Sequence, residues 1–109
     1  MKKRRNIPTL PIDFYSDGNQ KEKYRGILYD SIVEGVEQSL HKNKDKFIMA
    51  RVDDGEYLKD IEILKDSFKS NLNVVLRYYE EIEEYEKCSH TLNLINKIKC
   101  PDKEKKYFN

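Results

Sequence analysis

The most regular pattern of apolar and polar positions in the chain lies between residues 20 and 41. Apolar side chains recur there every three or four residues, at Tyr24, Ile27, Leu28, Ile32, Val36 and Leu40. This spacing places them on one face of a helix, with polar side chains on the other face. Asn19, a favourable N-cap residue, precedes the pattern, and the polar stretch HKNKDK follows it. The pattern predicts an amphipathic helix over residues 20–41.

A row of small residues lies inside this predicted helix, with Ser31, Gly35 and Ser39 placed four positions apart. Glycine inside a helix costs roughly 0.5–1 kcal/mol relative to alanine, so we expect a packing reason for Gly35. Small side chains at this spacing let a second helix approach closely, and the neighbouring Glu34 and Glu37 exclude a membrane setting. We therefore expect a C-terminal helix to cross closest at Gly35, within one chain or between two chains.

The segment KFIMARV, residues 46–52, is a short apolar run that fits either a strand or a buried helical turn. A strand would need a partner, and the chain offers two. One is the N-terminal leader, which its prolines restrict to the edge of a sheet. The other is residues 57–63, reached by a hairpin through Asp53, Asp54 and Gly55.

Residues 56–100 contain no glycine or proline, and mostly apolar residues occupy successive a and d positions of a heptad. These positions are Ile61, Leu64, Phe68, Asn71, Val75, Tyr78, Ile82, Tyr85, Ser89 and Leu92. The pattern is typical of a coiled-coil seam and predicts helix throughout, either unbroken or folded into a hairpin at SNLN, residues 70–73. The expected fold class is mainly α: an N-terminal amphipathic helix packed on a long C-terminal helix or helical hairpin, with room for one short β or extended element. A small α+β fold is the alternative.

The expected organisation is a basic, proline-containing leader over residues 1–18, a single α-rich domain over 19–100 and a basic tail over 101–109. The leader contains the apolar motif IPTLPIDFY. Such an extended arm either covers a groove between the chain's own helices or docks on another chain. For the docking case, the candidate contact residues are Ile7, Leu10, Ile12 and Phe14.

The formal net charge of +1 gives no general electrostatic reason to expect binding to nucleic acid or to a membrane. Two cysteines are too few for the disulfide framework of a small secreted domain, and no signal peptide or membrane span is evident. We therefore expect a cytoplasmic protein. The abundance of Lys, Asn, Ile and Tyr is typical of an AT-rich genome and suggests a phage or mobile element, whose protein would act in the host cytoplasm.

Candidate catalytic chemistry is sparse. His41 and His90 share no recognisable catalytic spacing with a nucleophile, and the four glycines are isolated rather than forming a phosphate-binding loop. Cys88, His90 and Cys100 are possible zinc ligands, but side chains two residues apart on a helix point in nearly opposite directions. We expect no catalytic site, no cofactor and no metal ion.

The acidic run EEIEEYE, residues 80–86, is the strongest candidate for a binding surface. Either it is the solvated face of a helix, or it docks on a basic partner surface together with the residues before it. The candidate contacts are Arg77, Tyr78, Glu80, Glu81, Glu83 and Glu84. The predicted function is a small non-catalytic protein-binding module, which in a phage would modulate host transcription or defence machinery.

Two alternatives stay open. The first is a nucleic-acid-binding protein that dimerises through its helices and uses its basic ends, at Lys2, Lys3, Arg4, Arg5, Lys103, Lys105 and Lys106. The second is a structural or assembly component built on the coiled-coil seam.

Overall fold

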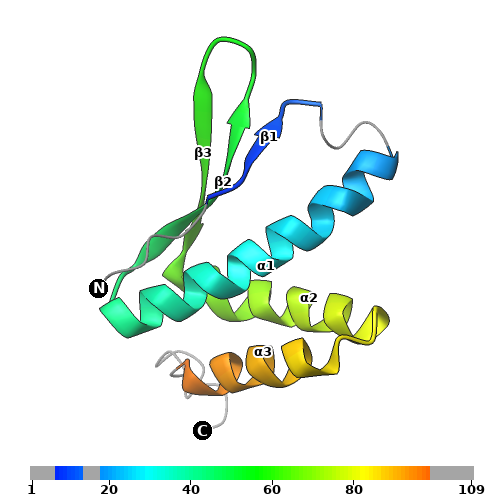
Figure 1. Ribbon diagram of the computed structural model, residues 1–109. Helices are drawn as coiled ribbons and strands as arrows, with labels where there is room; N and C mark the ends of the chain where they lie inside the picture. The colour runs from blue at the N-terminus through cyan, green and yellow to red at the C-terminus, as the bar shows by residue number, and fades with distance from the viewer. Residues whose placement is uncertain (1–6, 14–17, 99–109) are drawn as a thin grey trace, which may run out of the picture.

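The computed structural model describes residues 7–13 and 18–98, and within them it shows a three-stranded mixed sheet and three α-helices (Figure 1). The elements follow in the order β1 (Thr9–Pro11), α1 (Gly18–Lys42), β2 (Lys46–Asp53), β3 (Leu58–Leu64), a short 3-10 helix η1 (Lys65–Ser67), α2 (Phe68–Glu81) and α3 (Tyr85–Lys97). The fold is α+β. The prediction of a mainly α fold with a long C-terminal helix or heptad seam over residues 56–100 is wrong, because that segment contains a strand and two separate helices.

The predicted helix over residues 20–41 is confirmed as α1, which connects the two parallel strands of the sheet. The strand order is β1-β2-β3, with β1 parallel to β2 and β2 antiparallel to β3. Leu10 lies opposite Val52, and the backbone N–H of Arg51 donates to the carbonyl of Pro8 at 2.9 Å. Both partners suggested for residues 46–52 are therefore used. The edge position of β1 suits a strand whose prolines cannot donate hydrogen bonds.

The strand β3 matches the hairpin partner suggested at residues 57–63, although the sequence there also fits a helical heptad. Ile61 and Ile63 lie on the face toward the core, while Asp60 and Glu62 alternate with them, which is the two-residue period of a strand. The turn before β3 decides between the two. Gly55 has a φ of 97°, and the Asp54 carboxylate accepts the backbone N–H groups of Glu56 and Tyr57 at 2.9 and 2.8 Å.

The break between α2 and α3 falls at residues 82–84, and not at residues 70–73 as predicted. Glu83 has a φ of 60°, the backbone N–H of Glu84 donates to Tyr79 O, and that of Glu83 donates to Glu80 O. This is a Schellman helix end in which glutamate occupies the position that glycine usually takes. Ser70 and Asn71 instead lie in the first turns of α2, where their side chains donate to the carbonyl of Ser67.

The core lies between one face of α1 and the hairpin of α2 and α3. Its buried residues are Ile32, Val33 and Val36 of α1, Phe68, Leu72, Val75 and Tyr79 of α2, and Leu94 and Ile95 of α3. Phe47 and Met49 of β2 and Ile63 of β3 pack against this cluster from the sheet. The opposite face of the sheet carries ion pairs between Arg51 and Asp60 at 3.0 Å and between Lys46 and Glu62 at 3.3 Å, as a solvated face would.

The row of small residues on α1 faces the sheet. The Ser31 hydroxyl donates to the carbonyl of Met49 at 2.6 Å, Ser39 is buried, and a Cβ on Gly35 would overlap the ring of Phe47. The expectation that a C-terminal helix crosses closest at Gly35 is therefore wrong. Strand β2 makes the close approach, and α2 instead comes near Gly26, where a Cβ would meet the Tyr78 hydroxyl at 3.2 Å.

Candidate functional site

One residue of the leader packs in the interior of the chain's own fold, and two others line a groove. Leu10 is only 1% exposed and belongs to the interior, so it is not an accessible contact residue. Ile12 is 51% exposed, and Ile7 and Pro8 line a groove beside α1. Phe14 lies outside the described residues. The leader is thus at least partly the self-covering arm that its sequence allowed.

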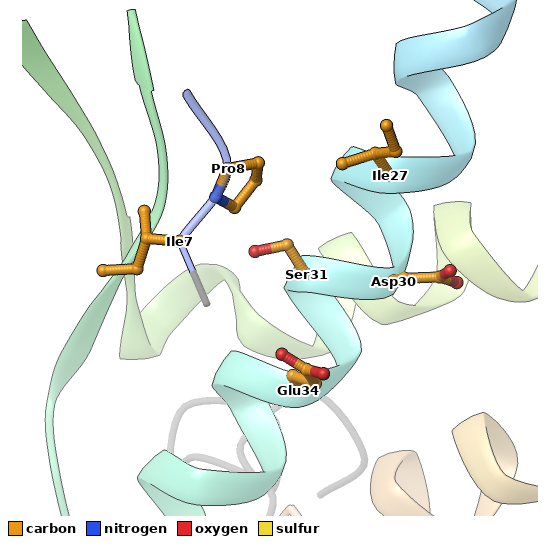
Figure 2. A pocket seen from close by; sticks show the side chains of 6 residues that line it. All are labelled: Ile7, Pro8, Ile27, Asp30, Ser31 and Glu34. Carbon is orange, nitrogen blue, oxygen red and sulfur yellow. The ribbon is translucent and has the colours of Figure 1, made fainter. Parts of the chain in front are cut away.

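The groove beside the leader, which we call the leader groove, has a volume of about 460 Å³ (Figure 2). Its lining consists of Ile7, Pro8, Ile27, Asp30, Ser31 and Glu34. Figure 2 shows Ile27 and Ser31 on the side of α1 toward Pro8, whereas the Asp30 side chain points away from the leader. The wall made by the leader and Ile27 is therefore apolar, and the far margin carries carboxylates.

A second groove, which we call the α3 groove, lies between α1 and the first turns of α3 and has a volume of about 360 Å³. It is lined by Asp30, Val33, Glu34, Glu37, Tyr79, Glu86, Lys87, His90 and Thr91. Asp30 and Glu34 line both grooves. Together with Glu37 they form one line along α1, because residues spaced by three and four positions share a helix face. We call Asp30, Glu34 and Glu37 the α1 carboxylate stripe.

Contacts with α2 and α3 hold one carboxylate of this stripe in place. The buried hydroxyl of Tyr79 donates a short hydrogen bond to Asp30 Oδ1. The ammonium of Lys87 lies 3.4 Å from the same oxygen and 5.4 Å from the centre of the Tyr79 ring. Burial, followed by the bond to Asp30, raises the pKa of Tyr79 above its ordinary value of 10.0, so its proton stays on the hydroxyl at neutral pH. Asp30 is therefore positioned as a fixed, half-exposed anion.

The rest of the α3 groove is also acidic. His90 Nε2 lies 3.2 Å from Glu37 Oε1, which ties the start of α3 to α1. Across both grooves the lining has four carboxylates, at Asp30, Glu34, Glu37 and Glu86, against the single ammonium of Lys87 when His90 is neutral. The surface between leader and α3 is thus a negatively charged strip with an apolar margin on the leader side.

The acidic run predicted as a ridge is divided between two elements. Glu80 and Glu81 end α2, while Glu83 and Glu84 form the turn to α3, and all four side chains are exposed. Glu84 Oε1 lies 3.7 Å from Lys87 Nζ, so the turn adjoins the α3 groove. Of the four ridge residues, Glu84 therefore lies next to the α3 groove.

The two residues predicted to accompany the ridge differ in their accessibility. Arg77 is exposed on α2, whereas Tyr78 is half-buried between helices. The Tyr78 ring makes an edge contact with Tyr29 at 4.9 Å between centroids, and the Arg25 guanidinium lies 4.9 Å from its centre. Tyr78 is thus already engaged in holding α1 against α2.

Of the residues considered for metal binding, the structure describes Cys88 and His90. Among residues 7–13 and 18–98, no group of three or more His, Cys, Asp or Glu side chains is arranged to hold a metal ion. Burial, with Glu80 and Glu84 nearby, raises the pKa of the Cys88 thiol, so the thiol is a weak nucleophile at neutral pH. Cys100, like the basic end residues Lys2, Lys3, Arg4, Arg5, Lys103, Lys105 and Lys106, lies outside the described part of the chain.

Sequence reasoning missed the α1 carboxylate stripe, although its signal was present. Asp30, Glu34 and Glu37 recur at helical spacing on the polar side of a correctly predicted helix. Their significance depends on the neighbours that the fold supplies: the leader on one side and α3 on the other. Neither neighbour is evident from the residues themselves.

No helix in the described ranges is long and apolar enough to cross a membrane. Comparison of the chain with protein-family models, with curated proteins and with solved structures found no match. The features of the molecule that point to a function are therefore the two grooves and the carboxylates between them.

Proposed function

We propose that this chain is a protein-binding module that holds a basic segment of a partner protein along the α1 carboxylate stripe. The observation that carries the proposal is that Asp30 and Glu34 line two grooves at once, with Ile7, Pro8 and Ile27 beside one and Val33 beside the other. A segment that lies along α1 would place cationic groups on the stripe and apolar groups on the leader side.

The physical basis is charge complementarity in a partly enclosed setting. Carboxylates lined along a groove raise the local concentration of cationic segments and speed their association. Arginine suits such a surface best, because its planar guanidinium can bind a carboxylate with two parallel hydrogen bonds. The apolar margin on the leader side would bury the aliphatic stems of arginine and lysine, which adds contact area to the ionic attraction.

The existing partners of the stripe are compatible with this role. Lys87 is about half exposed, and exposed ion pairs of this kind contribute only about 0–1 kcal/mol. An arriving arginine could therefore displace the Lys87 ammonium at small cost. Tyr79 would keep its bond to Asp30 throughout, which holds the carboxylate in position for the incoming cation.

The proposal is tested by fluorescence anisotropy with a labelled short peptide of alternating arginine and leucine. The site variant replaces Glu34, Glu37 and Glu86 with glutamine. The matched control removes the same charge elsewhere, through Glu56→Gln, Glu62→Gln and Asp66→Asn, which lie in the β2–β3 turn, on β3 and in η1. A second probe with neutral citrulline in place of arginine separates ionic from apolar binding.

Binding of the arginine probe should be strong at low salt and should weaken as salt screens the carboxylates. The site variant should bind the probe more weakly than the wild type, while the control variant stays near the wild type. Equal losses in the two variants would mean that net charge alone attracts the probe. That result, or equal binding of the citrulline probe, would remove the stripe as the docking surface.

A further inference from the structure

The chain has its own basic segment, and in the sequence it comes shortly before the leader residues that line the leader groove. Lys2, Lys3, Arg4 and Arg5 come shortly before Ile7 and Pro8, which line that groove. We propose that residues 2–5 bind along the α1 carboxylate stripe and occupy the site that a basic partner segment would take. The intramolecular binding stands on the groove and the leader alone, whereas the competition with a partner rests on the function proposed above.

The topology directs the leader toward the stripe. Since β1 and β2 are parallel and α1 connects them, α1 runs back in the direction opposite to β1 (Figure 1). A chain that continues the line of β1 backwards from Ile7 therefore passes along α1 toward its C-terminal end. Asp30 and Glu34 line the groove beside Ile7, and Glu37 follows in that same direction.

The distances along the two elements also agree. From Asp30 to Glu37 the helix advances by about 10 Å, at 1.5 Å per residue. Residues 2–5 span a similar length when extended, at about 3.3 Å per residue. The cations would thus be distributed over the same stretch as the carboxylates, and the long side chains of lysine and arginine supply additional reach.

The charges are complementary, and the covalent link favours occupancy. Residues 2–5 bring four cations to grooves whose lining has four carboxylates and one ammonium. A short flexible connection gives an effective concentration on the order of 1 mM. A segment whose free affinity is only about 100 μM would then be bound for roughly nine-tenths of the time.

The C-terminal basic residues provide the control for this proposal. The residues of α3 that line the groove, Glu86 to Thr91, lie in its first half, whereas the tail follows the far end of the helix beyond Ile98. Lys99, Lys103, Lys105 and Lys106 therefore make a control with the same number of cations. Replacing them changes the net charge as much as replacing residues 2–5 does.

The decisive experiment compares amide ¹H–¹⁵N spectra of the full-length wild type with those of two variants, K2S/K3S/R4S/R5S and K99S/K103S/K105S/K106S. The N-terminal variant should shift the amides of Asp30, Glu34 and Glu37 and those of residues 86–91, and high salt should shift the wild type in the same direction. The C-terminal variant should leave these amides unchanged. Unchanged stripe amides in the N-terminal variant, or equal shifts in both variants, would overturn the proposal.

Competition is measured with the labelled arginine and leucine peptide. If residues 2–5 occupy the stripe, the N-terminal variant should bind the probe about tenfold more tightly than the wild type, as expected for a site otherwise nine-tenths occupied. Equal affinity for wild type and variant would overturn the competition. If neither binds the probe while the stripe amides still shift, the proposed function fails and the intramolecular binding stands.

Discussion

The close approach of Phe47 to Gly35 predicts that adding a single methyl group at position 35 destabilises the protein. In Gly35→Ala, the added Cβ would overlap the Phe47 ring, which packs on Phe68 at 5.5 Å between centroids. The ring cannot rotate away without leaving that contact and the cluster of buried residues that it covers. The substitution therefore forces either the ring or the helix to move.

Two effects of opposite sign determine how much Gly35→Ala changes the free energy of unfolding. Alanine is favoured over glycine inside a helix by about 1 kcal/mol, which would stabilise the variant if nothing stood in the way. Overpacking a core costs typically about 1–3 kcal/mol, and the ring atoms here lie well inside any normal contact distance. We expect the steric effect to win, with a net loss of about 1–2 kcal/mol in the free energy of unfolding.

Urea unfolding followed by circular dichroism measures this loss, and Gly26→Ala is the matched control. At Gly26 the new Cβ would meet only the hydroxyl end of Tyr78 at 3.2 Å, so a small side-chain shift is enough and the helix preference should dominate. Gly26→Ala should be neutral or stabilising. The same experiment on Phe47→Leu and on the double variant G35A/F47L completes a cycle, in which the smaller side chain should recover part of the loss.

A neutral or stabilising Gly35→Ala would refute the argument, because it would mean that β2 does not lie against the row of small residues. A destabilised Gly35→Ala with no recovery in the double variant would also count against it, since the loss would then come from something other than Phe47.

Three further predictions concern other parts of the chain. Glu83→Gly should raise the free energy of unfolding by about 1 kcal/mol in the same urea assay, because glycine adopts the φ of 60° without the strain of a side chain. Burial and Asp30 raise the pKa of Tyr79, so its contribution to stability is complete below its ordinary value of 10.0. Above that pH the contribution falls by about 1.4 kcal/mol per pH unit, and unfolding measured against pH should show Tyr79→Phe lacking this fall. The backbone N–H groups of Tyr57 and Glu56 lower the pKa of Asp54, so an NMR titration should find the pKa of this carboxyl below the ordinary value of 3.8. As the pH falls through that pKa, the carboxylate is protonated and its hydrogen bonds no longer stabilise the turn.

The sequence predicted α1 well because one period dominates that stretch and its neighbours are strongly polar. Over residues 56–67 it left helix and strand open, because Ile61, Leu64 and Phe68 fit a heptad as well as a strand followed by a helix start. The hairpin turn at Gly55, with the pairing of β3 on β2, decides between them.

The break between α2 and α3 could also not be located from the sequence. Glutamate is rarely found in the left-handed conformation at a helix end, so Glu83 gives no signal of a break, whereas the Ser and Asn residues of SNLN suggested one where α2 begins. The row containing Gly35 was correctly interpreted as a packing feature. The element that packs against this row could not be identified from the sequence, because a glycine indicates a close approach without indicating which element makes it.

The candidate site was predicted only in its outline. An acidic docking surface was expected at residues 80–86, but the carboxylates that the fold places between two grooves are Asp30 and Glu34 of α1. A groove is a property of several elements together, so the polar face of one helix could not reveal it. Of the two roles predicted for the leader, the structure supports the covering of the chain's own interior, at Leu10, while Ile7 and Pro8 line the groove. Docking of the leader on another chain stays a prediction.

The most direct test of the central claim is the location of a bound basic segment on the chain. Titration of the arginine and leucine peptide into ¹⁵N-labelled K2S/K3S/R4S/R5S protein, followed by amide shifts, gives that location residue by residue. The expected result is a continuous set of shifted amides at Asp30, Glu34 and Glu37 and at residues 86–91, with β3 unaffected. Shifts centred on the open face of the sheet, or spread evenly over all acidic residues, would contradict it.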